Sequence, residues 1–327
     1  MRGSRVVTVA AVLVVLLVAG IAVALIGFRD HLPARIGRAC EVRTDAGTVY
    51  LNTSQMANAA TIAAVGIRRK LPERAVTVAL ATALQESKLE NLDDGDRDSI
   101  GLFQQRPSQG WGTREQILDP VYAINAFYDA LVEIDGYQGM RITEAAQEVQ
   151  RSGFPEAYED HADDARALAS ALTGNSQDGQ FTCVVRHTAG DESDDVDKAG
   201  LTARAAGVRA ELEAVFGELS LGGFDANGVS TGHMAGSAHY DGRALDVFVR
   251  PSGPENRKRG WAMAYYLVAQ AERLGVDHVI FDDMIWTSGR RSEEGWRDYD
   301  PGPLRGKSRS TTKILEHRDH VHVDVLD

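Results

Sequence analysis

Histidines are concentrated in the last part of the chain, where six of the nine follow residue 230. His239 and Asp246 stand seven residues apart, at the two ends of a glycine-containing segment. His317, His320 and His322 form a second group near the C-terminus. Imidazole nitrogens and carboxylate oxygens are good zinc ligands, and three protein ligands leave a fourth position for water. Any one of these histidines alone would be interpreted as a surface residue, but the two groups together favour a metal site.

The second histidine group opens a segment in which polar and apolar residues alternate. Side chains of a β-strand point alternately to its two faces, so His320, His322 and Asp324 share one face and the intervening valines share the other. At ~3.3 Å per residue, the two imidazoles are about 6–7 Å apart. That separation suits one metal ligand beside one acid–base group, and it predicts that the valines face the core.

A different kind of chemistry is indicated in the first half of the chain. Glu86 stands near the end of an apolar segment with helical spacing, and a polar loop and a glycine-led apolar turn follow it. A carboxyl group at the edge of an apolar helix can act as a proton donor, which cleavage of a glycosidic bond requires. For Glu86 alone, a surface glutamate is the ordinary alternative.

The acidic segment of residues 94–98 offers no assignable second carboxylate, because nothing in the sequence places Asp96 or Asp98 across a sugar from Glu86. Its acids also follow the first positions of a calcium-binding loop. However, Ser99 stands where that loop needs glycine, and Gln105 stands where it needs glutamate. We therefore interpret the segment as a polar loop.

The first half resembles the lysozyme-like, soluble lytic transglycosylase family. Glu86 with the serine after it, followed by Ser99-Ile-Gly-Leu-Phe-Gln104, is similar to the family's catalytic Glu-Ser and its Ser-x-Gly-Leu-Met-Gln turn. The resemblance covers about residues 50–175, and it implies that Glu86 is the general acid while Ser99 and Gln104 line a glycan cleft. The family's Ala-Tyr-Asn-x-Gly segment has no tyrosine counterpart at residues 146–153. A lone acid fits lytic cleavage to an anhydro sugar, and hydrolysis is left open.

The last part of the chain resembles the zinc peptidases grouped as lysostaphin-type, D-Ala-D-Ala metallopeptidase and hedgehog-like. Residues 237–246 match the Ser-x-His-x-x-Gly-x-Ala-x-Asp signature of that group. The ending His-x-x-His-x-His, at residues 317–322, is closer to the murein endopeptidase branch than to the Glu-x-Trp-His of the D-Ala-D-Ala branch. The resemblance spans about residues 225–327.

By that resemblance, His239, Asp246 and His322 are the ligands of a Zn²⁺ ion. His320 is the base or transition-state stabiliser beside the bound water, and His317 has a supporting role. Zinc lowers the pKa of its water to around 7, which allows attack on an amide carbonyl of a peptide stem or crosslink.

Three further residues near these motifs have open roles. Asp319 or Asp324 can orient a histidine, as carboxylates behind metal ligands do, and the sequence does not decide between them. Arg243 can hold a substrate carboxylate, but a surface salt bridge is the interpretation we favour.

These sites require two folded blocks. A length of 327 residues fits about two domains. Residues 40–183 are predicted as an all-α lysozyme-like domain, with Ser54 capping one helix and Thr113 with Gln116 forming a capping box. Residues 184–200 read as an acidic linker, and residues 201–327 as an α+β domain with a small antiparallel sheet. The overall class is α+β.

The two cysteines, Cys40 and Cys183, bracket the first block. Two free thiols are one interpretation, and a disulfide closing a loop of 143 residues is the one we favour. The chain-entropy model gives such a bond roughly 5 kcal/mol. A structural disulfide implies an oxidising compartment.

Residues 1–28 are predicted to be a transmembrane signal anchor, since residues 6–28 are apolar or glycine apart from Thr8 and are long enough to cross a bilayer. A cleaved signal peptide is the alternative, although its apolar region would be shorter. Arginines flank the segment on both sides, so the orientation rests on the disulfide. We expect a single-pass membrane protein with most of its chain outside the cytoplasm.

The acidic balance, 47 Asp and Glu against 35 Lys and Arg, argues against nucleic-acid binding. The combined expectation is a membrane-anchored bacterial enzyme that cuts the glycan strands and the peptides of peptidoglycan. Two alternatives are a non-catalytic peptidoglycan-binding protein and a peptidase whose helical domain only binds glycan. Any partner from the division or wall-synthesis machinery is left unspecified.

Overall fold

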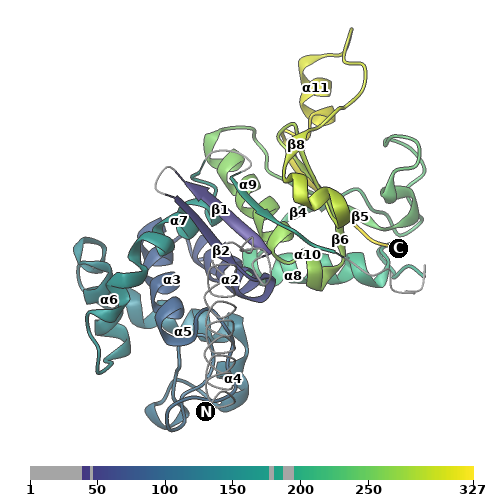
Figure 1. Ribbon diagram of the computed structural model, residues 1–327. Helices are drawn as coiled ribbons and strands as arrows, with labels where there is room; N and C mark the ends of the chain where they lie inside the picture. The colour runs from purple at the N-terminus through teal and green to yellow at the C-terminus, as the bar shows by residue number, and fades with distance from the viewer. Residues whose placement is uncertain (1–38, 45–46, 177–179, 187–194) are drawn as a thin grey trace, which may run out of the picture. The chain divides into compact units, whose positions relative to one another are not determined.

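The computed structural model describes residues 39–44, 47–176, 180–186 and 195–327 (Figure 1). The predicted anchor and residues 187–194 of the predicted linker lie outside this part of the chain. Among the described residues, no helix combines the length and the apolar character that a membrane crossing needs. Helices and strands are mixed along the described chain, which confirms the α+β class.

The first half consists mainly of helices that pack around α3. Their bounds are α2 (Thr53–Arg68), α3 (Glu73–Ser87), α4 (Arg114–Leu118), α5 (Pro120–Val132), α6 (Ile142–Gln150) and α7 (Ala162–Leu172), with short 3-10 turns η1 (Pro107–Gln109), η2 (Tyr137–Gly139) and η3 (Ala157–His161). The capping box of Thr113 and Gln116 is confirmed at the start of α4. The Ser54 cap was wrong, because Asn52 caps α2 together with Gln55.

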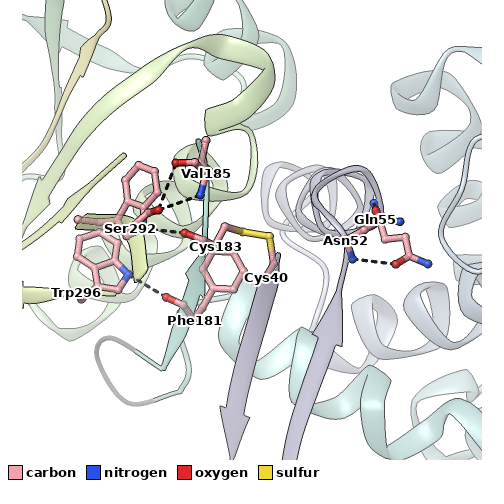
Figure 2. The surroundings of a disulfide bond; sticks show 9 residues. Cys40, Asn52, Gln55, Phe181, Cys183, Val185, Ser292 and Trp296 are labelled. Atoms are coloured by element: carbon pink, nitrogen blue, oxygen red, sulfur yellow. Dashed lines mark hydrogen bonds between the residues drawn. A yellow bond between two sulfur atoms is a disulfide. The ribbon is translucent and has the colours of Figure 1, made fainter. Parts of the chain in front are cut away.

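The two ends of this half form a sheet that the sequence analysis missed. It has the order β2-β1-β3, with β1 (Cys40–Thr44), β2 (Gly47–Leu51) and β3 (Phe181–Cys183) antiparallel. Cys40 lies directly opposite Cys183, and the two form the predicted disulfide (Figure 2). The block is therefore closed by a disulfide as predicted, but it is not all-α.

The second half contains a six-stranded antiparallel sheet of order β4-β5-β9-β6-β7-β8. Its strands are β4 (Ser220–Gly222), β5 (Ala244–Phe248), β6 (Val276–Phe281), β7 (Met284–Thr287), β8 (Arg297–Asp298) and β9 (His320–Val325). Its helices are α8 (Ala203–Phe216), α9 (Pro254–Ala269), α10 (Ala271–Leu274) and α11 (Arg309–Leu315), with turns η4 (Ala238–Asp241) and η5 (Gly289–Glu294). The last strand of the chain, β9, is central and lies between β5 and β6.

Strand alternation separates a core face of this sheet from a polar face. Val321, Val323 and Val325 of β9 are buried in the hydrophobic core, as the alternation predicts. Helix α9 packs against β6 and β9 from this side, and its Gly260 lies against the ring of Phe281 so closely that a Cβ would overlap it. The histidines of β9 therefore lie on the opposite face, away from α9.

The two halves share one hydrophobic core within the compact unit of Ala39–Asp327. Helix α9 also packs against α2, and the side-chain amide of Gln270 donates to the carbonyl of Ala57. Figure 2 shows a second connection, in which the Trp296 indole donates to the carbonyl of Phe181 and the hydroxyl of Ser292 bonds the backbone of Val185. Val185, at the start of the predicted linker, is thus buried against the second half.

Candidate functional site

Three side chains from three elements meet on the polar face of the large sheet. His239 is carried by η4, Asp246 by β5 and His322 by β9, and the strand register places Asp246 directly opposite His322. His322 Nδ1 lies 3.1 Å from His239 Nε2 and 3.2 Å from Asp246 Oδ1. The third separation, from His239 Nε2 to Asp246 Oδ1, is 3.4 Å. The structure therefore brings together all three predicted metal ligands.

These separations fit the geometry of a tetrahedral metal. Ligand atoms about 2.0–2.2 Å from such a metal lie roughly 3.3–3.5 Å from one another. The donor set of two imidazole nitrogens and one carboxylate oxygen is also one that zinc accepts. All three residues are at least nine-tenths buried, so the side chains are held in place by their surroundings.

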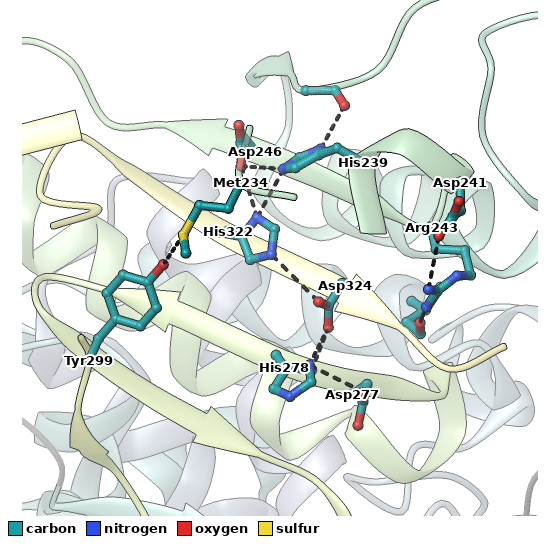
Figure 3. Close-up of polar contacts among 12 residues, drawn as sticks. Met234, His239, Asp241, Arg243, Asp246, Asp277, His278, Tyr299, His322 and Asp324 are labelled. Atoms are coloured by element: carbon teal, nitrogen blue, oxygen red, sulfur yellow. Dashed lines mark hydrogen bonds and ion pairs between the residues drawn. The ribbon is translucent and has the colours of Figure 1, made fainter. Parts of the chain in front are cut away.

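The orientation of His239 is set by the backbone at the end of β4. Its Nδ1 donates to the carbonyl of Gly223 at 2.6 Å, which leaves Nε2 as the nitrogen facing the other ligands (Figure 3). Gly223 has φ +80°, and a Cβ there would stand 2.3 Å from Cε1 of His239. Only glycine fits this position, because a side chain would overlap the imidazole.

A chain of polar side chains extends from His322 along β9 and β6. Its Nε2 lies 3.7 Å from Asp324 Oδ2, and Asp324 Oδ1 accepts from both Nδ1 and the backbone N–H of His278. Asp277 is 3.2 Å from the same His278 nitrogen (Figure 3). Asp324 is therefore held by His278 and lies behind the predicted ligand His322. Asp277, His278 and Asp324 also have the spacing of a group that could hold a metal ion.

His320 lies beside the three predicted ligands and has its own carboxylate partner. Its Nε2 is 3.7 Å from Asp246 Oδ1, and its Nδ1 is 2.8 Å from Asp319 Oδ1. Asp319 is held in turn by the guanidinium of Arg250. The sequence left open whether Asp319 or Asp324 orients a histidine. The structure places Asp319 within hydrogen-bond distance of His320, whereas Asp324 bonds His278 and lies 3.7 Å from His322.

His317 packs against these histidines from the loop that precedes β9. Its ring centroid lies 4.6 Å from that of His320 and 5.6 Å from that of His322, and Tyr299 contacts its other side edge-on. Burial, together with the neighbouring imidazoles, lowers the pKa of His317 to about 3. It is therefore uncharged at neutral pH, as suits a residue that packs beside a cation.

The electrostatics of the ligand group favour positive charge at its centre. Burial opposes ionisation of Asp246, yet hydrogen bonds with His239 and His322 hold the pKa of this carboxyl well below its usual range. Burial also opposes protonation of His322, but its two carboxylate neighbours raise its pKa to about 9. A group that stabilises a proton between buried carboxylates will also stabilise a divalent cation.

The three predicted ligands, His239, Asp246 and His322, line a cleft of about 810 Å³. One wall comes from the segment that follows β4, including Met234, and the other from the region of Tyr299 and Ile314. Arg243 also lines the cleft, but its guanidinium bonds the carbonyl of Val325 and forms ion pairs with Asp241 and Asp327. This is the salt-bridge role that we favoured for Arg243 from sequence.

The sequence analysis missed His233, which the structure places in the same group as His239 and Asp246. Their ligand atoms lie within 4.8 Å of one another. His233 belongs to neither predicted motif and is half-exposed on a loop, so only the general clustering of histidines after residue 230 could have pointed to it.

In the first half, Glu86 occupies the last turn of α3, where the helix ends at a left-handed Lys88. Its Oε1 accepts a hydrogen bond of 2.6 Å from the hydroxyl of Tyr158, which follows α6 in η3. The sequence showed no tyrosine at residues 146–153, and Tyr158 is the tyrosine that the fold brings to the carboxyl group. Glu86 therefore has a defined orientation and is half-buried rather than on an open surface.

The turn with Ser99 and Gln104 packs against the end of α3. The hydroxyl of Ser87 donates to the carbonyl of Leu102, and Ile100 pairs with Gln105 in a short antiparallel bridge. Ser99 is buried. The amide of Gln104 donates to the carbonyl of Gly101, within the turn itself.

The acidic loop has a structural role that the sequence did not reveal. Asp98 accepts from the guanidinium of Arg106 and the backbone N–H of Ser108. Hydrogen bonds from Ser108 and Arg106 hold the pKa of Asp98 well below its usual range. Asp98 therefore fixes the loop, and it is engaged with these partners rather than with Glu86.

A family model described as "VldE, C-terminal domain" matches residues 197–311. The match includes His233, His239 and Asp246 and ends before His317, so it covers part of the ligand group and about a third of the chain. No curated protein matches the chain.

Proposed function

We propose that this protein is a peptidoglycan hydrolase with two sites, a zinc-dependent peptidase in the second half and a glycan-cleaving site in the first. The observation that carries the proposal is the meeting of His239, Asp246 and His322, whose ligand atoms lie 3.1–3.4 Å apart. His320, oriented by Asp319, stands beside them.

In the peptidase site, His239 Nε2, Asp246 Oδ1 and His322 Nδ1 would hold the zinc ion. Bound zinc would supply a Lewis acid for the amide carbonyl and a water molecule that is acidic near neutral pH. His320 acts as the general base and then as the general acid. Asp319 bonds its Nδ1, which leaves Nε2 facing the proposed ligands. His320 takes a proton from the water whose oxygen bonds the amide carbonyl carbon, and it delivers this proton to the amine nitrogen when the C–N bond breaks.

In the glycan site, Glu86 donates a proton to the glycosidic oxygen as the bond breaks. Tyr158 holds one carboxyl oxygen and so directs the group. Of the two candidates for a second carboxylate, Asp98 is bonded to Arg106 and Ser108, and the side chain of Asp96 is exposed beside Arg97. This favours lytic cleavage, in which the sugar supplies the internal nucleophile, over hydrolysis with a second acid.

A second candidate function is a peptidase whose first half only binds glycan. The same engagement of Asp98 favours it, because a binding domain needs no second carboxylate. A protein that binds peptidoglycan without cutting it is the third. The predicted anchor would hold any of these at the outer side of the cytoplasmic membrane, where the disulfide is stable.

The test is mass spectrometry of the fragments released from purified peptidoglycan by the full-length protein with zinc. We expect split peptides that disappear in H322A or with a chelator and return with zinc. We also expect anhydro-muramyl fragments that disappear in E86Q but not in E148Q, a control at an exposed glutamate of α6.

The peptide products and the glycan products test the two proposed sites separately. Peptide products without glycan products would support the peptidase whose first half only binds glycan. If a folded, zinc-loaded protein released neither peptide nor glycan products but still sedimented with peptidoglycan, the non-catalytic binding function would be supported instead.

A further inference from the structure

A short segment lines the cleft beside the predicted ligands. We call residues 232–236 the strap. Gly232 and Gly236 bound it with φ +96° and +78°, and a Cβ at either glycine would meet nothing within 4 Å. Glycine is needed at these two positions for the backbone conformation rather than for close packing. The strap thus has two conformationally permissive ends.

Contacts with two tyrosines hold the strap, in addition to a turn in which the carbonyl of Met234 accepts from the N–H of Ser237. The hydroxyl of Tyr240 donates to the carbonyl of His233 at 2.7 Å and accepts from its N–H at 3.2 Å. On the far side, the hydroxyl of Tyr299 lies 3.9 Å from the sulfur of Met234, and Figure 3 shows these two side chains reaching toward each other. Both belong to the lining of the cleft, so this contact spans it. Met234 is nevertheless 57% exposed, so the strap buries little surface.

The strap brings the His233 imidazole to the ligand group. Its ring stacks on that of His239 at a centroid distance of 3.8 Å. One of its nitrogens lies within 4.8 Å of the ligand atoms of both His239 and Asp246.

We propose that His233 is a fourth protein ligand that closes the metal site in the resting protein, and that displacement of the strap opens the site for substrate. The proposal rests on the proposed function, because it assumes that His239, Asp246 and His322 bind the metal.

The number of protein ligands decides whether a bound zinc ion can also bind water. Zinc with four protein ligands is closed and structural, whereas a catalytic zinc keeps one position for water. With His233 in place the centre has the closed set, and without it the centre has the open set of three. The few contacts of the strap mark it as a segment that opens at low cost. Peptidoglycan entering the cleft would compete with Met234 for the wall at Tyr299.

The experiment compares the full-length protein with H233A and H233Q, each loaded with Co²⁺ and titrated with azide while the visible absorption is recorded. Azide must displace His233 in the unsubstituted protein, so we expect both variants to bind azide at least about 10-fold more tightly. Zinc affinity, measured by competition with a chelator, should fall by about 10-fold or more, because one ligand is lost. Peptide release from peptidoglycan should persist or increase.

M234A provides a matched variant, because it removes the contact with Tyr299 but keeps the imidazole. Its azide affinity should lie between those of the unsubstituted protein and H233A. E148Q, at an exposed glutamate of α6, should leave both metal measurements unchanged.

Unchanged azide and zinc affinities in H233A and H233Q would overturn the proposal. Weaker zinc binding with loss of peptide release would also overturn it, since His233 would then be a permanent part of the active centre. Failure of the unsubstituted protein to bind Co²⁺ or Zn²⁺ would instead refute the proposed peptidase.

Discussion

At the level of single residues, the proposed metal centre depends on carboxylates that are not themselves proposed as ligands. Asp319 fixes His320, and Asp324 stands behind His322 while it is held by His278. Such partners keep a ligand in one orientation and raise its basicity. Each aspartate therefore lies behind a different histidine of β9, one with a proposed acid–base role and one proposed as a ligand.

The substitution D324N should weaken metal binding, although Asp324 is not itself a proposed ligand. The amide keeps the shape of the carboxylate but loses its charge, so D324N should lower zinc affinity by roughly 10–100-fold. Competition with a chelator measures this. D241N, which alters the exposed partner of Arg243, serves as the control and should bind zinc normally. Equal affinities in the two variants would show that Asp324 does not support His322.

The pH dependence of stability should report on His161, which lies against Gln85 beside the proposed glycan site. Burial, reinforced by the nearby Lys88, lowers its pKa from 6.5, so the folded protein favours the neutral ring. The stability it contributes is complete above pH 6.5 and is lost as the pH falls through the lower pKa of the folded state. The unfolding temperature should thus fall less between pH 7 and pH 5 in H161Q than in the unsubstituted protein. Identical pH profiles would contradict this.

Sequence reasoning found most of the site residues because ligand chemistry restricts the residue types. It placed His239, Asp246, His320 and His322, since their spacing matches a recognisable motif. It missed His233, because a loop histidine becomes a candidate only when the fold brings it back over the site. It also missed Tyr158, whose contact with Glu86 joins residues 72 positions apart.

At the level of elements, the pairing of β5 with β9 forms the site. Alternation along β9 predicted which side chains share a face, and the buried valines confirm it. The register that places Asp246 opposite His322 could not be predicted, since it depends on a pairing across 76 residues. The small first sheet was missed for a similar reason, because β3 returns to β1 from the far end of the block.

Capping signals in the sequence predicted a helix start correctly where both partners of a capping box lie in one turn. They were ambiguous where two neighbouring residues could each cap the helix. Thr113 and Gln116 form their capping box because both partners are present in one turn. Asn52 and Ser54 are both good cap residues, and the structure uses Asn52 because Gln55 completes its box. The hydroxyl of Ser54 donates instead to Glu90.

The end of β4 offers a test of how an element positions a ligand. G223A would place a methyl group 2.3 Å from the His239 ring, and zinc affinity should fall at least about 10-fold. G228A is the matched control, because Gly228 has the same φ of +80° with nothing within 4 Å of its Cβ. It should lose about 1 kcal/mol of stability and keep its zinc affinity. Equal zinc affinities in both variants would remove the proposed role of Gly223.

At the level of the whole molecule, the two predicted blocks are built around a common core. The sequence indicated two blocks from the acidic segment between them, but nothing local in it indicated that α2 would pack against α9. Gln270 and Thr61 bond across this contact, 209 residues apart. Such long-range contacts depend on shape complementarity between elements, which no sequence pattern records.

The disulfide should contribute strongly to the stability of this arrangement, since Cys40 and Cys183 are 143 residues apart. Replacing both with serine should lower the free energy of unfolding by about 2–5 kcal/mol, because the open chain gains entropy when it unfolds. Urea denaturation of the oxidised protein and the double variant measures the difference. A loss below about 1 kcal/mol would show that the bond adds little to the contacts of β1 with β3.

The central claim is that His239, Asp246 and His322 form one metal centre. The most direct test is an anomalous difference map at the zinc edge from crystals of the full-length protein grown with zinc. We predict one strong peak about 2.0–2.2 Å from His239 Nε2, Asp246 Oδ1 and His322 Nδ1. A map with no peak among these three atoms, or with its main peak elsewhere, would contradict the claim.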